Sequence, residues 1–342
     1  MKTKLLSGRG PKGGEGIRIA ARLLSDGNLV AFPTETVYGL GASIYHPRAI
    51  REIYRVKGRP ADNPLIIHLW SIGQVHLLAR SIPLMFWVLA DRFMPGPLTI
   101  VLRKSQTLPA LVTAGLRTVA IRLPDHPVAR RLLKEAGVPI VAPSANISGR
   151  PSPTRAQHVL EDLDGKIAAV LDGGPCRIGV ESTVLDITTP TPIILRPGGV
   201  PREEIEEALG IHVRTARPTR RKPASPGMKY KHYSPNAEVL VFEGEPGRVF
   251  HAMRRMQRQL LHTGKKVGVM ASGLAGKRYP GSVYYSLGST GPSGAARRLF
   301  HGLRTLDLER VDVILCQGLE EENIGTAFMN RLRKAASRRI RV

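Results

Sequence analysis

Cysteine and long apolar runs are both scarce in this 342-residue sequence. The two cysteines, Cys176 and Cys316, can build neither a disulfide framework nor a C-x-x-C metal or redox site, so we expect two small buried side chains. No apolar run approaches the roughly 20 residues that a membrane helix needs. The stretch from Met1 to Lys12 is polar and basic without an apolar centre. We therefore expect a cytoplasmic protein.

Acidic and aromatic residues are also few. Asp and Glu number 27 against 51 Lys and Arg, which gives a formal charge of +24, and aromatic residues make up 5% of the chain. Such a surface attracts polyanions such as nucleotides and RNA, although a general basic bias of the host's proteins explains the charge equally well. The low aromatic content argues against a platform on which bases stack.

A familiar phosphate-binding signature is missing as well. The sequence contains no G-x-x-x-x-G-K-S/T, so any nucleotide must be held by another device.

With 42% hydrophobic residues, the chain is long enough for two domains that each bury a core.

Short apolar runs alternate with amphipathic segments over the first 214 residues. Runs of apolar residues predict strands at 29–32, 65–69, 98–102, 119–123, 140–142, 167–171, 183–187 and 193–195. Helical spacing predicts helices at 17–24, 47–57, 84–93, 127–136, 155–163 and 202–209. Thr154 and Gln157 have the spacing of a capping box for the fifth helix. The sequence thus predicts an α/β domain with a large mixed sheet.

A stretch rich in Pro, Lys and Arg follows this domain. It has no hydrophobic periodicity, so we expect an interdomain linker. After it, strands at 238–242, 266–270 and 311–316 alternate with helices at 248–261 and 295–306. This alternation predicts a small, mostly parallel sheet covered by helices. The predicted division of the chain is 10–214, 215–237 and 238–342.

Four polar clusters lie at the ends of predicted strands of the first domain. They are FPTETVYGLG at 32–41, KGRPADNPL at 57–65 with His68, VAPSANISG at 141–149, and GVESTV at 179–184 with Arg196. Hydroxyls beside glycines suit a small polar ligand that lies close to the backbone. Lys57 and Arg59, two residues apart and held by prolines, could clamp a triphosphate. Taken singly, each cluster fits a solvated loop or a hydrogen-bonded turn as well.

Together, the order and spacing of these clusters closely resemble the YrdC-like threonylcarbamoyl-AMP synthases. The paired K-x-R and S-x-N motifs of that family correspond to Lys57, Arg59, Ser144 and Asn146, and P-T-E-T-x-Y-G-L, D-N-P-L, P-G-P-L-T and R-L-P are also present. The resemblance covers residues 16–199. The segment SPGMKYKHYSP at 225–235 looks like the linker of the long form of the family. That form implies a YrdC-like twisted mixed sheet with flanking helices, a linker that closes over the active site, and a small Rossmann-like C-terminal domain.

The resemblance also implies an activity. The family makes threonylcarbamoyl-AMP from L-threonine, bicarbonate or CO2, and ATP, with release of pyrophosphate, for the threonylcarbamoyl-adenosine modification of tRNA. It implies Mg2+ with the ATP, a downstream tRNA-modifying threonylcarbamoyltransferase as a partner, and tRNA itself as a further candidate. No carboxylate cage for Mg2+ stands out, and Glu35, Asp62 and Glu181 are the candidates.

Residue roles follow from the same resemblance. The predicted catalytic residues are Lys57 and Arg59. The predicted threonine site consists of Thr36, His68, Arg122, Ala142 and Ser182. The predicted ATP site consists of Lys57, Arg59, Asn63, Thr118, Ser144, Asn146, Ser152, Arg196, Tyr230 and Tyr233. A guanidinium such as that of Arg122 matches a carboxylate bidentately, and the hydroxyl of Thr36 or Ser182 could bind the hydroxyl of threonine.

Two rival interpretations remain open at this point. A basic concave sheet can hold double-stranded RNA by its backbone without any catalysis, although the polar motifs are too clustered for a backbone-only surface. A related domain that transfers a carbamoyl group from another donor is the second rival. The sequence lacks the zinc-type cysteine spacings expected of it.

Overall fold

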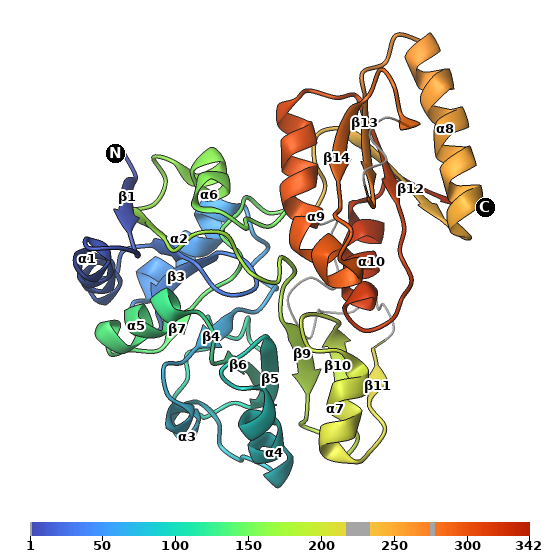
Figure 1. Ribbon diagram of the computed structural model, residues 1–342. Helices are drawn as coiled ribbons and strands as arrows, with labels where there is room; N and C mark the ends of the chain where they lie inside the picture. Colours follow the sequence, from blue (N-terminus) through green and yellow to red (C-terminus); the bar gives the residue numbers. More distant parts are fainter. Residues whose placement is uncertain (1, 217–232, 274–277) are drawn as a thin grey trace. The chain divides into compact units, whose positions relative to one another are not determined.

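The computed structural model describes residues 2–216, 233–273 and 278–342 (Figure 1). The chain divides into two compact units. The first comprises Met1–Ser148, Ser152–Arg177 and Glu181–Tyr230, and the second comprises Gly149–Pro151, Ile178–Val180 and Lys231–Val342. Residues 217–232 of the predicted linker, including Tyr230, lie outside the described residues. The domain bounds drawn from the sequence stay predictions.

The first unit is built on one large mixed sheet. Among the described residues this sheet has eleven strands in the order β1-β8-β2-β3-β7-β4-β6-β5-β9-β10-β11. The strands are β1 Lys4–Ser7, β2 Val30–Phe32, β3 Gly39–Ser43, β4 Ile66–His68, β5 Leu98–Arg103, β6 Thr118–Arg122, β7 Ile140–Val141, β8 Ala169–Asp172, β9 Thr183–Asp186, β10 Ile193–Arg196 and β11 Arg214–Thr215. Parallel and antiparallel pairs both occur, β4 with β6 and β5 with β6 for example, which confirms the predicted mixed sheet.

Helices flank this sheet on both faces. They are α1 Gly13–Ser25, α2 Pro47–Lys57, α3 Val75–Leu78, α4 Leu84–Phe93, α5 Pro127–Ala136, α6 Ala156–Leu163 and α7 Arg202–Leu209, with a 3-10 turn at Ile72–Gln74. Side chains of α2, α4, α6 and α7 build the main core against one face of the sheet. Side chains of α1 and α5 build a second core with β2, β7 and β8. Both cores come from amphipathic helices, as the sequence predicts.

Side chains alternate between the two faces of the sheet along β4, β6, β5 and β9, because successive side chains of a strand point in opposite directions. Ile67, Ile121 and Ile100 belong to the main core. Their neighbours Ile66, Ala120, Val101 and Val184 instead form a small apolar cluster with Leu195. A polar residue two positions from a member of this cluster along the same strand therefore lies on the same face of the sheet.

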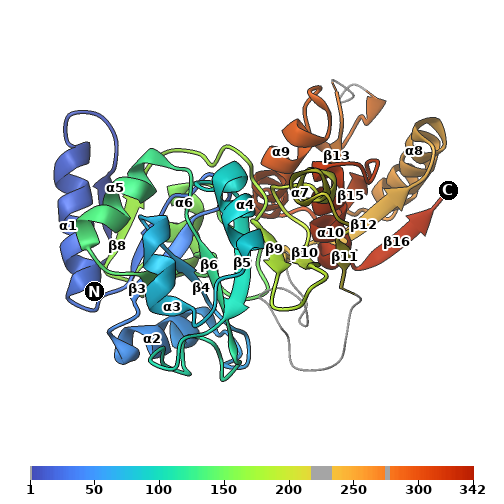
Figure 2. The same cartoon turned by 90° about the horizontal axis from the view of Figure 1, so that it is seen from below.

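The second unit contains a parallel five-stranded sheet in its described part, in the order β14-β13-β15-β12-β16. Its elements are β12 Glu238–Glu243, α8 Pro246–His262, β13 Val267–Ala271, β14 Val283–Ser286, α9 Gly291–Leu308, β15 Val313–Gln317, α10 Ile324–Ala335 and β16 Arg338–Arg341. Helix α8 covers one face, and α9 and α10 lie on the other (Figure 2). A parallel sheet with helices on both faces confirms the Rossmann-like expectation.

Several local expectations can be compared with the structure directly. The range 47–57 is a helix as predicted, with Pro47 in its first turn and Gly58 in the left-handed conformation just past its end. Both cysteines are buried. No helix in the described ranges is long and apolar enough to cross a membrane.

The predicted capping box is wrong. Helix α6 begins one residue later than expected, its N-cap is Arg155, and no side chain caps it. Thr154 is buried, and its backbone N–H donates to Nδ1 of His158 instead. The strands β1, β3, β14 and β16 and the helix α10 were not expected from the sequence.

Two glycines of α1 provide a test of this packing. A Cβ on Gly16 would lie 2.0 Å from the carbonyl oxygen of Ser7 in β1, whereas a Cβ on Gly14 meets only arginine side-chain ends at 3.7 and 3.8 Å. We expect Gly16→Ala to destabilise the protein by about 1–3 kcal/mol through overpacking. Gly14→Ala should leave stability unchanged or raise it by up to about 1 kcal/mol, because alanine favours helix. Thermal unfolding of the two variants measures both effects, and a Gly16→Ala protein as stable as wild type contradicts this packing.

Candidate active site

The candidate site lies on the face of the first sheet that carries the small apolar cluster. His68 on β4 and Arg122 on β6 are direct partners in the parallel register of these strands. Thr118 and Arg122 share the parity of Ala120, so they lie on the same face of β6. Ser182 stands immediately before β9, which pairs with β5. The sheet therefore brings residues from distant motifs to one face.

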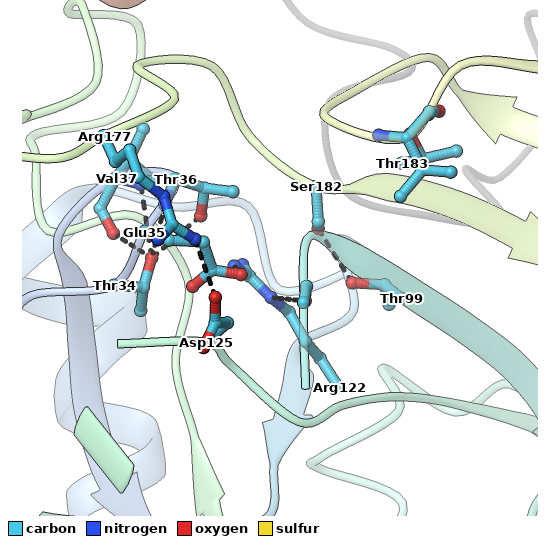
Figure 3. A network of polar contacts seen from close by, with 12 residues as sticks. Thr34, Glu35, Thr36, Val37, Thr99, Arg122, Asp125, Arg177, Ser182 and Thr183 are labelled. Carbon is cyan, nitrogen blue, oxygen red and sulfur yellow. Dashed lines mark hydrogen bonds and ion pairs between the residues drawn. The ribbon is translucent and has the colours of Figure 1, made fainter. Parts of the chain in front are cut away.

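A buried ion pair lies at one end of this face (Figure 3). Arg122 donates from its guanidinium to Oε1 of Glu35 at 2.6 Å, and the two side chains are only 5% and 1% exposed. Arg122 also donates from Nε to the carbonyl oxygen of Gly96 at 3.3 Å. These contacts fix the orientation of the guanidinium. Because a guanidinium has five N–H groups, others are left to donate to a further acceptor.

His68 stands beside this pair as a neutral ring. Burial, and next the positive charge of Arg122, lower the pKa of His68 to about 3. Its ring meets that of Phe32 edge-on, with the centroids 6.0 Å apart. The imidazole therefore offers one donor and one acceptor at neutral pH.

Three buried polar atoms at the ion pair or near it have no hydrogen-bond partner among the described residues. They are Oε2 of Glu35, Nδ1 of His68 and Nδ1 of His126. Both rings lie within electrostatic reach of the ion pair. Arg122 lowers the pKa of His68, and Glu35 acts to raise the pKa of His126 against the larger effect of burial. Unsatisfied buried polar atoms are costly, so their grouping indicates a place for a polar ligand.

Hydroxyl groups border the same end of the sheet. Oγ1 of Thr34 donates to the carbonyl oxygen of Val37, so the 2.8 Å contact between Thr34 and Thr36 uses the hydroxyl hydrogen of Thr36. Thr36 therefore retains an accepting lone pair. The hydroxyl oxygens of Ser182 and Thr99 lie 2.8 Å apart (Figure 3). Arg196 donates to both oxygens of Ser182.

The K-x-R and S-x-N motifs meet, as the sequence led us to expect. The ammonium group of Lys57, at the end of α2, donates to the carbonyl oxygen of Ser144 at 2.5 Å and to that of Asn146. The N–H of Ser148 donates back to the carbonyl oxygen of Lys57 at 2.8 Å. Burial, and next the charge of Arg59, hold the pKa of Lys57 well below its usual range, while Asp162 acts in the opposite direction.

Backbone contacts join the S-x-N loop, which Lys57 holds, to the P-T-E-T-x-Y-G-L motif. The N–H of Leu40 donates to the carbonyl oxygen of Pro143, and the N–H of Ala145 donates to the carbonyl oxygen of Tyr38. Gly39 and Ser144 also form an isolated bridge. The loop after β2, which carries Glu35 and Thr36, and the S-x-N loop after β7 are thus one connected structure.

The other predicted ATP residues lie around this centre or farther along the sheet. Arg59 donates to the carbonyl oxygens of Asn63 and Pro64, and Ser152 donates to Glu181 at 2.6 Å. Thr118, at the end of β6 opposite Arg122, lines a cavity of about 610 Å³. Its other lining residues are Arg80, Arg103, Lys104, Ser105, Gln106, Arg117 and Thr188.

Two of the predicted ligand residues make contacts apart from those around Lys57 and Arg122. Ala142 donates from its backbone to the carbonyl oxygen of Ile66, and its side chain is buried in the core under α1 and α5. Tyr233 belongs to the second unit, where its ring lies 5.2 Å from that of Phe300. Tyr230 is outside the described residues. The ligand roles of all three stay predictions.

Known proteins resemble the whole chain. The family model Sua5_yciO_yrdC, described as "Telomere recombination", matches residues 22–198, and a model described as "Threonylcarbamoyl-AMP synthase, C-terminal domain" matches residues 200–337. The threonylcarbamoyl-AMP synthase of Pyrococcus abyssi is 51% identical over 327 residues, which is 95% of each chain. That of Bacillus subtilis is 47% identical over 325 residues, 94% of this chain and 93% of the relative. The chain belongs to the threonylcarbamoyl-AMP synthase family.

A solved structure extends this result to three dimensions. The crystal structure of P. abyssi Sua5 complexed with L-threonine matches with a TM-score of 0.95 at 49% identity, and covers 99% of this chain and 100% of that one. The chain is therefore an enzyme of the threonylcarbamoyl-AMP synthase family in its long form. The interpretation as a noncatalytic RNA-binding protein is wrong for the chain as a whole.

Three residues of this synthase site were not predicted as substrate contacts. Glu35 was considered only for Mg2+, and Thr99 and Asp162 were not considered. Asp162 accepts from the N–H of Ile147 at 3.2 Å and so holds the S-x-N loop. The sequence offers little signal for them, because each gains its partner from a segment distant along the chain.

The carboxylates do not form a metal cage. Glu35 is paired with Arg122, and Glu181 accepts from Ser152. No group of three or more His, Cys, Asp or Glu residues that could hold a metal occurs in the part of the chain that the structure describes. The side chains of the described residues alone therefore do not fit a resident Mg2+ ion.

The low pKa of His68 makes a testable prediction for stability. The unfolded chain binds a proton on this ring below about pH 6.5, whereas the folded state stays neutral down to about pH 3. The free energy of unfolding should therefore fall as the pH drops from about 7.5 to about 5, by about 2 kcal/mol from this residue. Urea unfolding of wild type and His68→Gln at both pH values measures it, because the variant lacks this part of the decrease. Equal pH dependence in the two proteins would show that His68 is not buried and neutral.

Proposed function

We propose that the enzyme condenses L-threonine with bicarbonate or CO2 and joins the resulting carbamate to the AMP part of ATP, releasing pyrophosphate. The product is threonylcarbamoyl-AMP, which serves the threonylcarbamoyl-adenosine modification of tRNA through a downstream threonylcarbamoyltransferase. The observation that carries the proposal is the convergence of Lys57 with the Ser144 and Asn146 loop beside a second polar site at Arg122. The P. abyssi structure, described as complexed with L-threonine, supports it.

In this proposal, threonine binds at the Arg122 end of the site. Arg122 still has N–H groups to donate to the carboxylate, as a guanidinium fork does in bidentate pairs. Thr36 and Ser182 lie at the same end and bind the threonine hydroxyl, Thr36 as the acceptor. A site that bonds a hydroxyl rejects analogues without it by several orders of magnitude, whereas one methyl group contributes only about 1–3 kcal/mol. Modest use of serine is therefore expected.

Glu35 is suited to activate the amino group. An ammonium must lose a proton before its nitrogen can attack carbon, and Oε2 of Glu35 is a buried acceptor that has no partner within the described ranges. In the proposed step this carboxylate takes the proton. The free amine then forms the C–N bond with bicarbonate and water leaves, so that the product is the carbamate anion. The neighbouring Arg122 donates to the other oxygen of this carboxylate, Oε1, and so fixes its position.

ATP occupies the Lys57 end of the site. A carbamate oxygen attacks the α-phosphorus while the bond to pyrophosphate breaks, and no covalent enzyme intermediate is needed. Lys57, Arg59 and Arg196 supply the positive charge that this transition state requires, while Ser144 and Asn146 position the nucleotide. Mg2+ enters with ATP and is held by phosphates and water, since the described carboxylates form no cage for it.

The substrate requirement tests the proposed function directly. We expect ATP to be converted to AMP and pyrophosphate only when threonine and bicarbonate are both present, because the attacking group is their carbamate. Mass spectrometry of the quenched reaction should detect threonylcarbamoyl-AMP. Conversion that proceeds without threonine would contradict the proposal and favour a different carbamoyl donor.

Arg59→Ala tests the role of the basic pair. We expect this variant to lose at least about 100-fold in the rate of pyrophosphate release, as for the removal of one charge-stabilising group. Arg51→Ala is the matched control, because Arg51 is an exposed arginine of α2, the helix that ends two residues before Arg59, and it should keep the wild-type rate. Lys57→Ala is less informative, since its ammonium is buried and holds two loop carbonyls, so that its loss also weakens the fold. Equal rates for Arg59→Ala and Arg51→Ala would remove Arg59 from the ATP site.

Glu35→Gln separates the proton acceptor from the shape of the site. The amide keeps an acceptor for Arg122 but cannot take a proton, so kcat/KM for threonine should fall by about 100-fold or more and recover partly at alkaline pH. Asp125→Asn is the control, because Asp125 pairs with Arg177 in an exposed contact. An unchanged rate and pH profile in Glu35→Gln would exclude Glu35 as the base while leaving the reaction itself in place.

A further inference from the structure

An arginine-rich face of α8 in the second unit has no part in the proposed reaction. His251, Arg255 and Arg258 follow one another at spacings of four and three residues, so they lie on one face of the helix. All three are exposed. They extend over about 10 Å at the 1.5 Å rise of a helix. The opposite face carries Val249 and Met253, which pack into the core of the unit.

A cavity of about 720 Å³ opens on this face. It is lined by Phe250, His251, Arg254, Arg255, Arg258, Gln259 and Arg278. Four of these seven residues are arginines, and none is acidic. We call this set of residues the α8 pocket.

Specific contacts hold two of its arginines in place. Arg254 lies over the ring of Tyr279 at 5.9 Å and donates to Oε1 of Gln257 at 2.5 Å. Gln257 is fully buried and donates to the carbonyl oxygen of Pro280 and to the hydroxyl of Ser282. These bonds tie the helix to the segment that follows Arg278.

Arg278 is held by the same kind of contact. Its guanidinium lies over the ring of Phe250 at 5.6 Å. Contacts of guanidinium groups with aromatic faces cost little rotamer entropy and leave the N–H groups available for a ligand. The cations of the pocket are therefore partly organised before any ligand arrives.

Acidic side chains do not neutralise this charge. Within the described residues, the ion pairs of the second unit involve Arg150, Lys266, Arg333 and Arg339. None of the four arginines of the α8 pocket has an ion pair there. An uncompensated group of guanidiniums raises the local concentration of anions.

We propose that the α8 pocket binds the phosphodiester backbone of RNA. Guanidinium forks match phosphate oxygens bidentately, and the linear array along α8 suits successive phosphates better than one small anion. A protein partner would need an apolar centre, but Phe250 is the sole hydrophobic residue of the lining and Arg278 already covers it. Base stacking is not required, so binding is independent of sequence. The α8 pocket therefore adds an RNA-binding surface to the second unit.

The test uses the full-length enzyme and a fluorescently labelled, unmodified tRNA transcript. We expect Arg255→Gln/Arg258→Gln to bind this RNA roughly 10-fold more weakly in anisotropy titrations. The slope of log K against log salt should become shallower by about 1.5, because each lost phosphate contact removes about 0.7–0.9. Threonine-dependent pyrophosphate release should stay at the wild-type rate, so that failure of this proposal is separate from failure of the proposed function.

Two further variants control for net charge and for the guanidinium group. Arg338→Gln/Arg341→Gln removes the same charge from exposed positions of β16 in the same unit and should retain the wild-type affinity and salt slope. Arg255→Lys/Arg258→Lys keeps the charge, so it should keep the salt slope and lose only part of the affinity.

Four results would overturn the proposal. One is wild-type affinity and slope in Arg255→Gln/Arg258→Gln, and another is an equal loss in the β16 control, which would indicate net charge alone. The third is complete displacement of the tRNA by inorganic pyrophosphate at an ionic strength matched with salt, which would identify a site for small phosphates. Binding to anionic lipid vesicles that is lost in the same variant while tRNA binding persists would assign the pocket to membranes and would equally contradict RNA binding.

Discussion

The buried ammonium group of Lys57 is the contact on which the rest of the site depends. A cation removed from water must find acceptors within the protein, and Lys57 finds them in the backbone of Ser144 and Asn146. This requirement joins the end of α2 to the loop after β7. That loop is in turn bonded to the β2–β3 connection. One desolvated charge therefore brings together motifs that are almost 90 residues apart in the chain.

The Arg122–Glu35 pair has the corresponding role at the other end. Removing one partner of a buried ion pair leaves an uncompensated charge and is strongly destabilising, so the pair holds the β2–β3 connection against β6. It does so without using all of its hydrogen-bonding capacity, because Oε2 of Glu35 has no partner in the part of the chain that the structure describes. The same contact thus stabilises the fold and keeps an acceptor available for a substrate. The sheet face that carries Arg122 also carries the small apolar cluster around Ala120.

The sequence predicts regular elements well where local chemistry specifies them. The helix at 47–57 has proline at its start and glycine after its end, and both signals act within a few residues. Strand β3 escapes prediction because its sequence, GLGAS, has no β-branched residue. Its glycines serve packing instead: a Cβ on Gly41 would lie 2.9 Å from the ring of Phe32. Motif order indicates that Lys57 meets Ser144, but the partners of Glu35 depend on strand order, which no local pattern specifies.

The central claim is that one pocket joins a nucleotide at Lys57 and Arg59 to an amino acid at Arg122. The most direct measurement is a crystal structure of the enzyme with L-threonine and a nonhydrolysable ATP analogue. The account predicts the phosphates within hydrogen-bonding distance of Arg59 and of the Ser144–Asn146 loop, with the threonine amino group at Oε2 of Glu35 and facing the α-phosphorus. Phosphates bound away from that loop, or threonine separated from the α-phosphorus by the sheet, would contradict it.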